Sequence, residues 1–261
     1  MEHGVRSALV MCVLLSACAI EPEDDDLGEV GSEVQTTNRL ASNKLAANHL
    51  ATAKLAGGAL PDTVQSLIST ADGREVLTYI VGCALAGGET LKVGGYAFPG
   101  SIGLAPSWRS RALTTSERRW VSACVYARTN LYGVQIALSL RGDHPALAAP
   151  LGEQVGYALV EGAFYGDLFD AHPTAYACLG LIKETGLPLS TLGARACAAP
   201  TGAGTTTGCG FTYTGACSVL DLGLAPACAR IAAPYGDCRT GRSPKDPRIH
   251  EVITVVLATA L

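Results

Sequence analysis

The cysteines constrain this chain more than any other sequence feature. There are ten in 261 residues. Two lie in an apolar leader, and eight follow it: Cys83, Cys124, Cys178, Cys197, Cys209, Cys217, Cys228 and Cys238. This number is even, and the last six fall in a stretch rich in Gly, Ala and Pro. In an exported chain, such a pattern is typical of a disulfide framework that supports loop-rich structure.

The sequence does not choose among the pairings of eight cysteines, so we assign partners by proximity along the chain. The predicted pairs are Cys83–Cys124, Cys178–Cys197, Cys209–Cys217 and Cys228–Cys238. Each closed loop would stabilise the fold by about 2–4 kcal/mol, because it restricts the unfolded chain. Structural zinc is the competing interpretation. No two cysteines have the C-x-x-C spacing, however, so we predict neither a metal site nor a cofactor.

The first residues form a secretory signal. Arg6 precedes an apolar run at 8–15, which is too short to span a bilayer. The Leu-Ser-Ala-Cys motif that ends at Cys18 resembles the lipobox of bacterial lipoproteins. The resemblance implies cleavage of a signal peptide at 1–17, lipidation of the Cys18 sulfur and acylation of the new amino terminus, a lasting membrane anchor. Ala19, in place of Asp, implies sorting to the outer membrane. An ordinary cleaved signal with an incidental cysteine is the alternative.

Charge is concentrated just after this motif. The formal net charge of the chain is −4, and residues 61–261 carry 15 acidic and 15 basic side chains. The segment 18–37 contains seven acidic residues and no basic one. Such a run is self-repelling and solvated, so we predict an acidic tether. A neutral domain argues against nucleic-acid binding through a basic surface.

A five-residue repeat occupies 38–60. Its leucines recur at every fifth position: Leu40, Leu45, Leu50, Leu55 and Leu60. That period gives no single stripe on a helix and alternates faces on a strand. The segment therefore resembles a pentapeptide-repeat array, although that family usually has Ala where this chain has Asn. We predict a semi-ordered stalk. A helix, or a solenoid edge docked on the domain, is the alternative.

The remaining residues, 61–261, are predicted to form one α+β domain. Residues 114–117 spell a capping box, which predicts that a helix begins there. Apolar and polar residues alternate over 134–140, as in a half-buried strand, and 154–169 and 249–257 are also extended. Helical patterns precede most strands without βαβ alternation. We expect a helical N-terminal part packed on a small antiparallel sheet, with a disulfide-framed, loop-rich C-terminal region.

The strongest candidate site lies in the extended segment that contains Glu161, Tyr165 and Asp167. On a regular strand these three side chains share one face. Two carboxylates among aromatic rings are typical of sugar-handling acid pairs. Six residues of strand would separate them by about 20 Å, however, which is too far for such a pair unless the glycines fold the segment back.

Glu161 lies in an apolar run, and a buried carboxylate requires a cation or several donors. Arg128, at the end of the capped helix, and Arg141, at the end of the following strand, are the natural partners. We interpret Glu161 as the structural partner of Arg128. A catalytic or ligand-binding role for Glu161, and simple exposure, are the alternatives.

One further set of residues could carry chemistry. Asp143 and His144 precede Pro145 in a pattern typical of a turn. A His–Asp dyad at this turn would need a nucleophile, for which Ser122 and Ser139 are the candidates. The chain has neither a G-x-S-x-G elbow nor a phosphate-binding G-x-x-x-x-G-K loop.

The motif at 15–18, the repeat at 38–60 and the later cysteines together resemble uncharacterised cysteine-rich lipoproteins of myxobacteria. The resemblance implies a cell-envelope location and no particular activity. We expect a lipid-anchored protein whose domain binds an envelope protein or a surface polysaccharide. The alternative is a secreted hydrolase that uses Glu161 as general acid or base, helped by Asp167 or His144, so the sequence leaves open whether the chain is an enzyme.

Overall fold

The computed structural model describes residues 35–38, 40–41, 62–133, 135–148, 156–180, 195, 197–202, 204–218, 225–230 and 232–258. The predicted signal peptide, the lipidation site Cys18, most of the acidic tether and most of the repeat lie outside these residues. The chain is a mixed α+β protein in which strands predominate over helices, and its described residues contain four disulfides.

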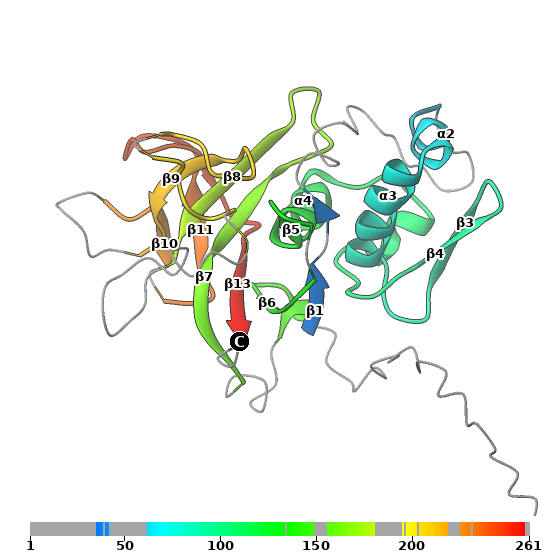
Figure 1. The fold of residues 1–261 in the computed structure, drawn as a ribbon, viewed down its shortest axis with the longest axis horizontal. Coiled ribbons are helices and arrows are strands. Elements are labelled where there is room, and N and C mark those ends of the chain that lie inside the picture. The colour runs from blue at the N-terminus through cyan, green and yellow to red at the C-terminus, as the bar shows by residue number, and fades with distance from the viewer. Residues whose placement is uncertain are drawn as a thin grey trace, which may run out of the picture. The chain divides into compact units, whose positions relative to one another are not determined.

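A six-stranded sheet forms the centre of the fold, in the order β1-β6-β13-β7-β8-β9 (Figure 1). The strands are β1 (Gln35–Asn38), β6 (Ile136–Arg141), β7 (Tyr157–Asp167), β8 (Thr174–Leu179), β9 (Thr212–Ala216) and β13 (Ile253–Ala258). All neighbours are antiparallel except β8 and β9. The last strand, β13, therefore enters the middle of the sheet, and its apolar residues are buried on both faces.

The described α-helices are α2 (Asp62–Ser69), α3 (Ala71–Ala84) and α4 (Thr115–Ala127), and two short 3₁₀ helices are η1 (Pro106–Arg109) and η2 (Pro145–Leu147). The predicted capping box is confirmed: the Thr114 hydroxyl accepts from the Glu117 N–H, and the Glu117 carboxylate accepts from the Thr114 N–H. Helix α4 contacts β7 and β13, and α3 contacts α4. None of the helices in the described ranges is both long and apolar enough to cross a bilayer.

Three smaller sheets complete the fold. β10 (Cys228–Arg230), β11 (Gly236–Arg239) and β12 (Arg248–Ile249) form one antiparallel sheet. β3 (Thr90–Val93) and β4 (Tyr96–Pro99) form a hairpin, and its turn residues Gly94 and Gly95 both have positive φ, which glycine adopts without strain. β2 (Leu40–Ala41) pairs with β5 (Thr129–Asn130) in parallel.

Residues that the sequence assigns to the tether and repeat take part in this fold. The tether ends in Gln35–Thr37, and these residues, with Asn38, form the edge strand β1 against β6. Leu40, the first leucine of the repeat, is fully buried in the main core. The remaining repeat leucines lie outside the described residues.

The six-stranded sheet separates two apolar clusters. Phe164 and Ala177 belong to the larger cluster, with α3 and α4, whereas Ala163, Tyr165 and Cys178 belong to a smaller cluster with β10 and β11. Successive side chains of β7 and of β8 thus point to opposite sides, as the pleat of a strand requires. We call the second set the small cluster.

Two of the four disulfides match the proximity prediction. Cys83–Cys124 joins α3 to α4, and Cys228–Cys238 joins opposite residues of β10 and β11. In each pair the two cysteines follow one another among the cysteines of the chain, and the elements that carry them are neighbours in space.

The other two predicted pairs, Cys178–Cys197 and Cys209–Cys217, are wrong. The structure joins Cys178 to Cys217 and Cys197 to Cys209. The reason is the pairing of β8 with β9, which brings the Cα atoms of Cys178 and Cys217 to 5.0 Å across 39 residues of chain. Proximity along the chain fails here because Cys197 and Cys209, which are bonded to each other, lie between Cys178 and Cys217 in the sequence.

Candidate functional site

Glu161 is the extra residue of a β-bulge in β7. Its neighbours Val160 and Gly162 lie opposite Val256 and Val255 of β13, and Glu161 itself has no opposite residue on that strand. A bulge places one additional residue on one strand of an antiparallel pair, and the local alternation of side chains shifts by one. The bulge therefore redirects the Glu161 side chain.

The predicted common face of Glu161 and Tyr165 is wrong for this reason. Tyr165 points into the small cluster. The Glu161 carboxylate instead meets Arg195, whose guanidinium lies 5.4 Å from the ring centroid of Phe164, a member of the larger cluster. A one-residue shift in a strand transfers every later side chain to the other face, so the bulge separates two residues that simple alternation would group.

Glu161 and Arg195 form a buried ion pair. The Arg195 Nε donates to Glu161 Oε1 at 3.0 Å and lies 2.9 Å from Oε2, and the two residues are only 3% and 2% exposed. Burial raises the pKa of Glu161, and the charge of Arg195 opposes this rise. Burial also lowers the pKa of Arg195. The predicted partner of Glu161 was Arg128, so the identity of the cation is corrected.

Arg128 has a different role. Its guanidinium lies 4.6 Å from the ring centroid of Tyr79, and its Nη1 lies 3.9 Å from the sulfur of Cys83. Desolvation lowers its pKa to about 10, and Tyr79 opposes this effect. Arg141, the other expected cation, donates to Ser139 Oγ and to the Tyr157 carbonyl. The described contacts of both arginines are therefore with residues other than Glu161.

Tyr165 links the two larger sheets. Its hydroxyl donates to the carbonyl of Arg239 in β11 at 2.6 Å and lies 2.7 Å from Thr214 Oγ1 in β9. Its ring stacks on Tyr176, with centroids 5.5 Å apart. Burial raises the pKa of the phenol, so the hydroxyl stays protonated. These contacts are structural ones.

Asp167 and His144 also make local structural contacts. Asp167 accepts from Arg118 of α4 at 3.0 Å and from the Phe169 N–H at 3.0 Å, which fixes the end of β7. His144 Nδ1 accepts from the Ala146 N–H, and the ring meets Trp120 edge-on at 5.2 Å. Burial lowers the pKa of His144.

The candidate nucleophiles, Ser122 and Ser139, also form hydrogen bonds that serve the fold. Ser122 donates to the Arg118 carbonyl and accepts from the Leu168 N–H, and Ser139 accepts from Arg141 Nε. Both serines are buried. The structure therefore gives neither hydroxyl a hydrogen bond to His144 among the described contacts, and the predicted dyad lacks an activated nucleophile.

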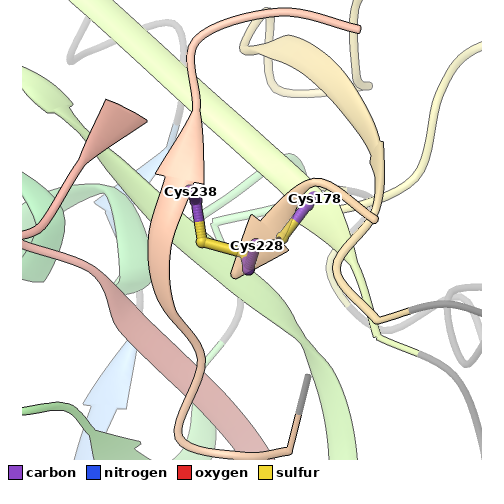
Figure 2. Close-up of side chains that lie close together, drawn as sticks. All are labelled: Cys178, Cys228 and Cys238. Carbon is purple, nitrogen blue, oxygen red and sulfur yellow. Dashed lines mark hydrogen bonds between the residues drawn. A yellow bond between two sulfur atoms is a disulfide. The ribbon is translucent and has the colours of Figure 1, made fainter. Parts of the chain in front are cut away.

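Among the described residues, three cysteines whose sulfurs could together approach a metal ion belong to a sulfur cluster that the sequence did not predict. It contains the two disulfides Cys178–Cys217 and Cys228–Cys238. The sulfurs of Cys178, Cys228 and Cys238 all lie within 4.8 Å of one another (Figure 2). Its members come from β8, the residue after β9, β10 and β11, so no spacing in the sequence could have marked the cluster.

Cysteine is a common zinc ligand, but the cysteines of the sulfur cluster are oxidised to disulfides. Thiolate, rather than disulfide sulfur, is the metal ligand. In the structure each of these sulfurs is bonded to another sulfur, so the residues would offer a thiolate set only after both bonds were reduced.

The fold and the cluster define a class of protein: a disulfide-framed α+β domain. Comparisons of the chain with protein-family models, with curated proteins and with solved structures give no match.

Proposed function

We propose that this chain is an exported, lipid-anchored protein of the bacterial cell envelope. The observation that carries the proposal is the set of four disulfides in the described part of the chain. Disulfides form and persist in oxidising compartments and are rare in the cytosol. They support export through a signal at 1–17, whereas the proposed lipidation at Cys18 and sorting to the outer membrane rest on the Leu-Ser-Ala-Cys motif and on Ala19.

The role of the domain in this proposal is to bind an envelope protein or a surface polysaccharide. The alternative, a hydrolase that uses Glu161, has less support. A general acid or base must reach the substrate within hydrogen-bond distance. Glu161 is 3% exposed and its carboxylate is paired with Arg195. Asp167 and His144, the residues expected to assist Glu161, make other contacts: Asp167 with Arg118, and His144 with the Ala146 N–H.

We also propose how the helical part, the sheet and the loop-rich region of the domain are arranged. A helical N-terminal part would pack on a small antiparallel sheet, followed by a disulfide-framed, loop-rich region. The contacts of α4 with β7 support the first part, and three disulfides between Cys178 and Cys238 support the second. With the lipobox and the repeat, this arrangement makes the cysteine-rich myxobacterial lipoproteins our proposed relatives.

Membrane fractionation of the full chain tests the anchor. We expect the wild-type protein in the outer-membrane fraction, with a mass that includes acyl chains on Cys18, and Cys18→Ser in the soluble fraction. Cys12→Ser is the matched control, because it removes a cysteine of the leader upstream of the lipidation site and should leave the location unchanged. Retention of Cys18→Ser in the membrane fraction would refute the anchor.

A sedimentation assay tests the binding role. The soluble Cys18→Ser protein is mixed with purified outer-membrane polysaccharide or with envelope fragments treated with protease. We expect saturable co-sedimentation. Loss after protease treatment would identify a protein partner, and survival would identify a polymer. Absence of co-sedimentation with untreated envelope would contradict the binding role.

A further inference from the structure

Two disulfides touch each other inside the small cluster. The sulfur of Cys178 lies 3.5 Å from the sulfur of Cys228, and each is bonded to a further sulfur, that of Cys217 or of Cys238. All four side chains have no exposed surface. Figure 2 shows Cys228 between Cys178 and Cys238. The four sulfurs thus follow one another in the order 217, 178, 228, 238.

Backbone hydrogen bonds fix the positions of these cysteines. The Cys217 N–H donates to the Leu179 carbonyl at 2.9 Å, and the Cys228 N–H donates to the Cys217 carbonyl at 3.1 Å. Cys238 lies directly opposite Cys228 across the β10–β11 pair. The contact between the two disulfides is therefore a property of the strand arrangement rather than of mobile side chains.

We propose that these four residues form a thiol–disulfide exchange centre in which Cys178 and Cys228 are the exchanging pair. Exchange proceeds when a thiolate attacks a disulfide sulfur, so it requires the two sulfurs to meet. The 3.5 Å contact supplies that encounter within the folded domain.

The chemistry begins with a two-electron reductant, such as a dithiol or a phosphine, that converts one disulfide into two thiols. If Cys228–Cys238 is opened, the Cys228 thiolate attacks the Cys178 sulfur. A bond between Cys178 and Cys228 forms, the Cys178–Cys217 bond breaks, and the Cys217 sulfur leaves with the electron pair and takes up a proton. This second step consumes no further electrons.

The second route gives the same product. If the reductant opens Cys178–Cys217, the Cys178 thiolate attacks Cys228, and Cys238 leaves. Both routes end with one disulfide, Cys178–Cys228, and with thiols at Cys217 and Cys238. Convergence is the signature of the exchange centre, because two independent disulfides would give two different half-reduced species.

Exchange would change which strands are covalently joined. The native bonds connect β8 to the end of β9, and β10 to β11. The product bond connects β8 of the six-stranded sheet to β10 of the three-stranded sheet and releases Cys238 of β11. The redox state would thus decide whether the two sheets are linked covalently.

A cysteine variant tests the exchange without an external reductant. Cys238→Ser leaves Cys228 as a thiol in contact with the Cys178–Cys217 bond. The folded variant is quenched in acid, alkylated and mapped by mass spectrometry. We expect a peptide pair linked through Cys178 and Cys228, with the alkyl group on Cys217. Alkylation of Cys228 alone, with Cys178–Cys217 intact, would overturn the proposal.

The matched control is Cys209→Ser. It leaves Cys197 as a thiol whose described contact is the Thr129 carbonyl at 3.2 Å rather than a second disulfide. We expect at least about tenfold less non-native pairing than in Cys238→Ser, because exchange requires sulfur contact.

The wild-type protein provides the second measurement, which remains decisive if Cys238→Ser does not fold. A limiting amount of a water-soluble phosphine is added, and the species with two thiols are alkylated in acid. We expect a species with both Cys217 and Cys238 alkylated and Cys178 linked to Cys228. The species whose two thiols lie within the sulfur cluster decide the outcome: if these thiols are always native partners, Cys178 with Cys217 or Cys228 with Cys238, the exchange centre is refuted.

Discussion

Replacing Glu161 by Gln should destabilise the domain strongly, because it leaves the Arg195 charge buried without a counter-ion. At the observed 2.9 Å separation, the two charges attract by about 6 kcal/mol at an effective dielectric constant of about 20. Desolvation of both groups offsets part of this attraction. We expect the free energy of unfolding to fall by about 3–5 kcal/mol, the usual cost of removing one partner of a buried pair.

Urea denaturation with the disulfides intact measures this change. The buried residues Trp108 and Trp120 provide the fluorescence signal. Glu89→Gln is the matched control, because Glu89 pairs with Arg109 at 3.2 Å on the surface, where the arginine side chain is 59% exposed. We expect the control to cost less than about 1 kcal/mol.

A double variant separates the ion pair from the packing around it. Glu161→Met combined with Arg195→Met replaces both charges by apolar side chains, and the second Met can cover the Phe164 ring. We expect the double variant to recover most of the loss, since apolar replacements of buried ion pairs are often neutral. The reasoning is refuted if Glu161→Gln alone unfolds within about 0.5 kcal/mol of the wild type.

Three further perturbations have defined outcomes. Desolvation acts to raise the pKa of Glu117, but hydrogen bonds from its neighbours outweigh it and lower the pKa from 4.5 to about 2. The stability that this carboxylate contributes is therefore present above pH 4.5 and is lost as the pH falls towards 2, so acid titration of Glu117→Gln should lack about 1–2 kcal/mol of this loss. Tyr165→Phe should lower the free energy of unfolding by about 1–3 kcal/mol in urea, because two buried hydrogen-bonding groups lose a partner; an unchanged midpoint would contradict this role. Asp237 Oδ1 accepts a hydrogen bond from His250 Nδ1 at 3.0 Å, and this contact raises the pKa of His250 above 6.5. The contribution of the pair is therefore present at lower pH and is lost as the pH rises through the raised pKa. Asp237→Asn should return the His250 pKa towards 6.5 in an NMR titration, and an unchanged value would exclude the contact in solution.

Features that depend on neighbouring residues could be predicted from the sequence. The capping box at Thr114 and Glu117 needs only a three-residue spacing, and it forms as predicted. The alternation over 134–140 likewise predicts β6. Cys83–Cys124 and Cys228–Cys238 agree with the proximity prediction because no other cysteine lies between the two members of either pair, although 41 residues separate Cys83 from Cys124.

The candidate site could not be predicted to the same extent. The sequence selected Glu161 as a carboxylate that would need a cation, and this requirement is met. It could not select Arg195, which follows Glu161 by 34 residues, over Arg128, which lies almost as far before it at the end of a predicted helix. Nor could it reveal the bulge at Glu161, because the bulge is defined by the register of β13, which lies near the C-terminal end of the sequence.

The sequence by itself determined the mixed α+β class, an even number of cysteines for a disulfide framework, a domain with balanced charge, and the starting point of α4. The tertiary structure decided which cysteines pair, which side of the sheet each residue of β7 faces, and that two disulfides meet at Cys178 and Cys228. The physical reason is the distance along the chain between the residues that determine each feature. Composition and short spacings act through a few adjacent residues, whereas these outcomes depend on strand order and register, which long connections fix only in the folded chain.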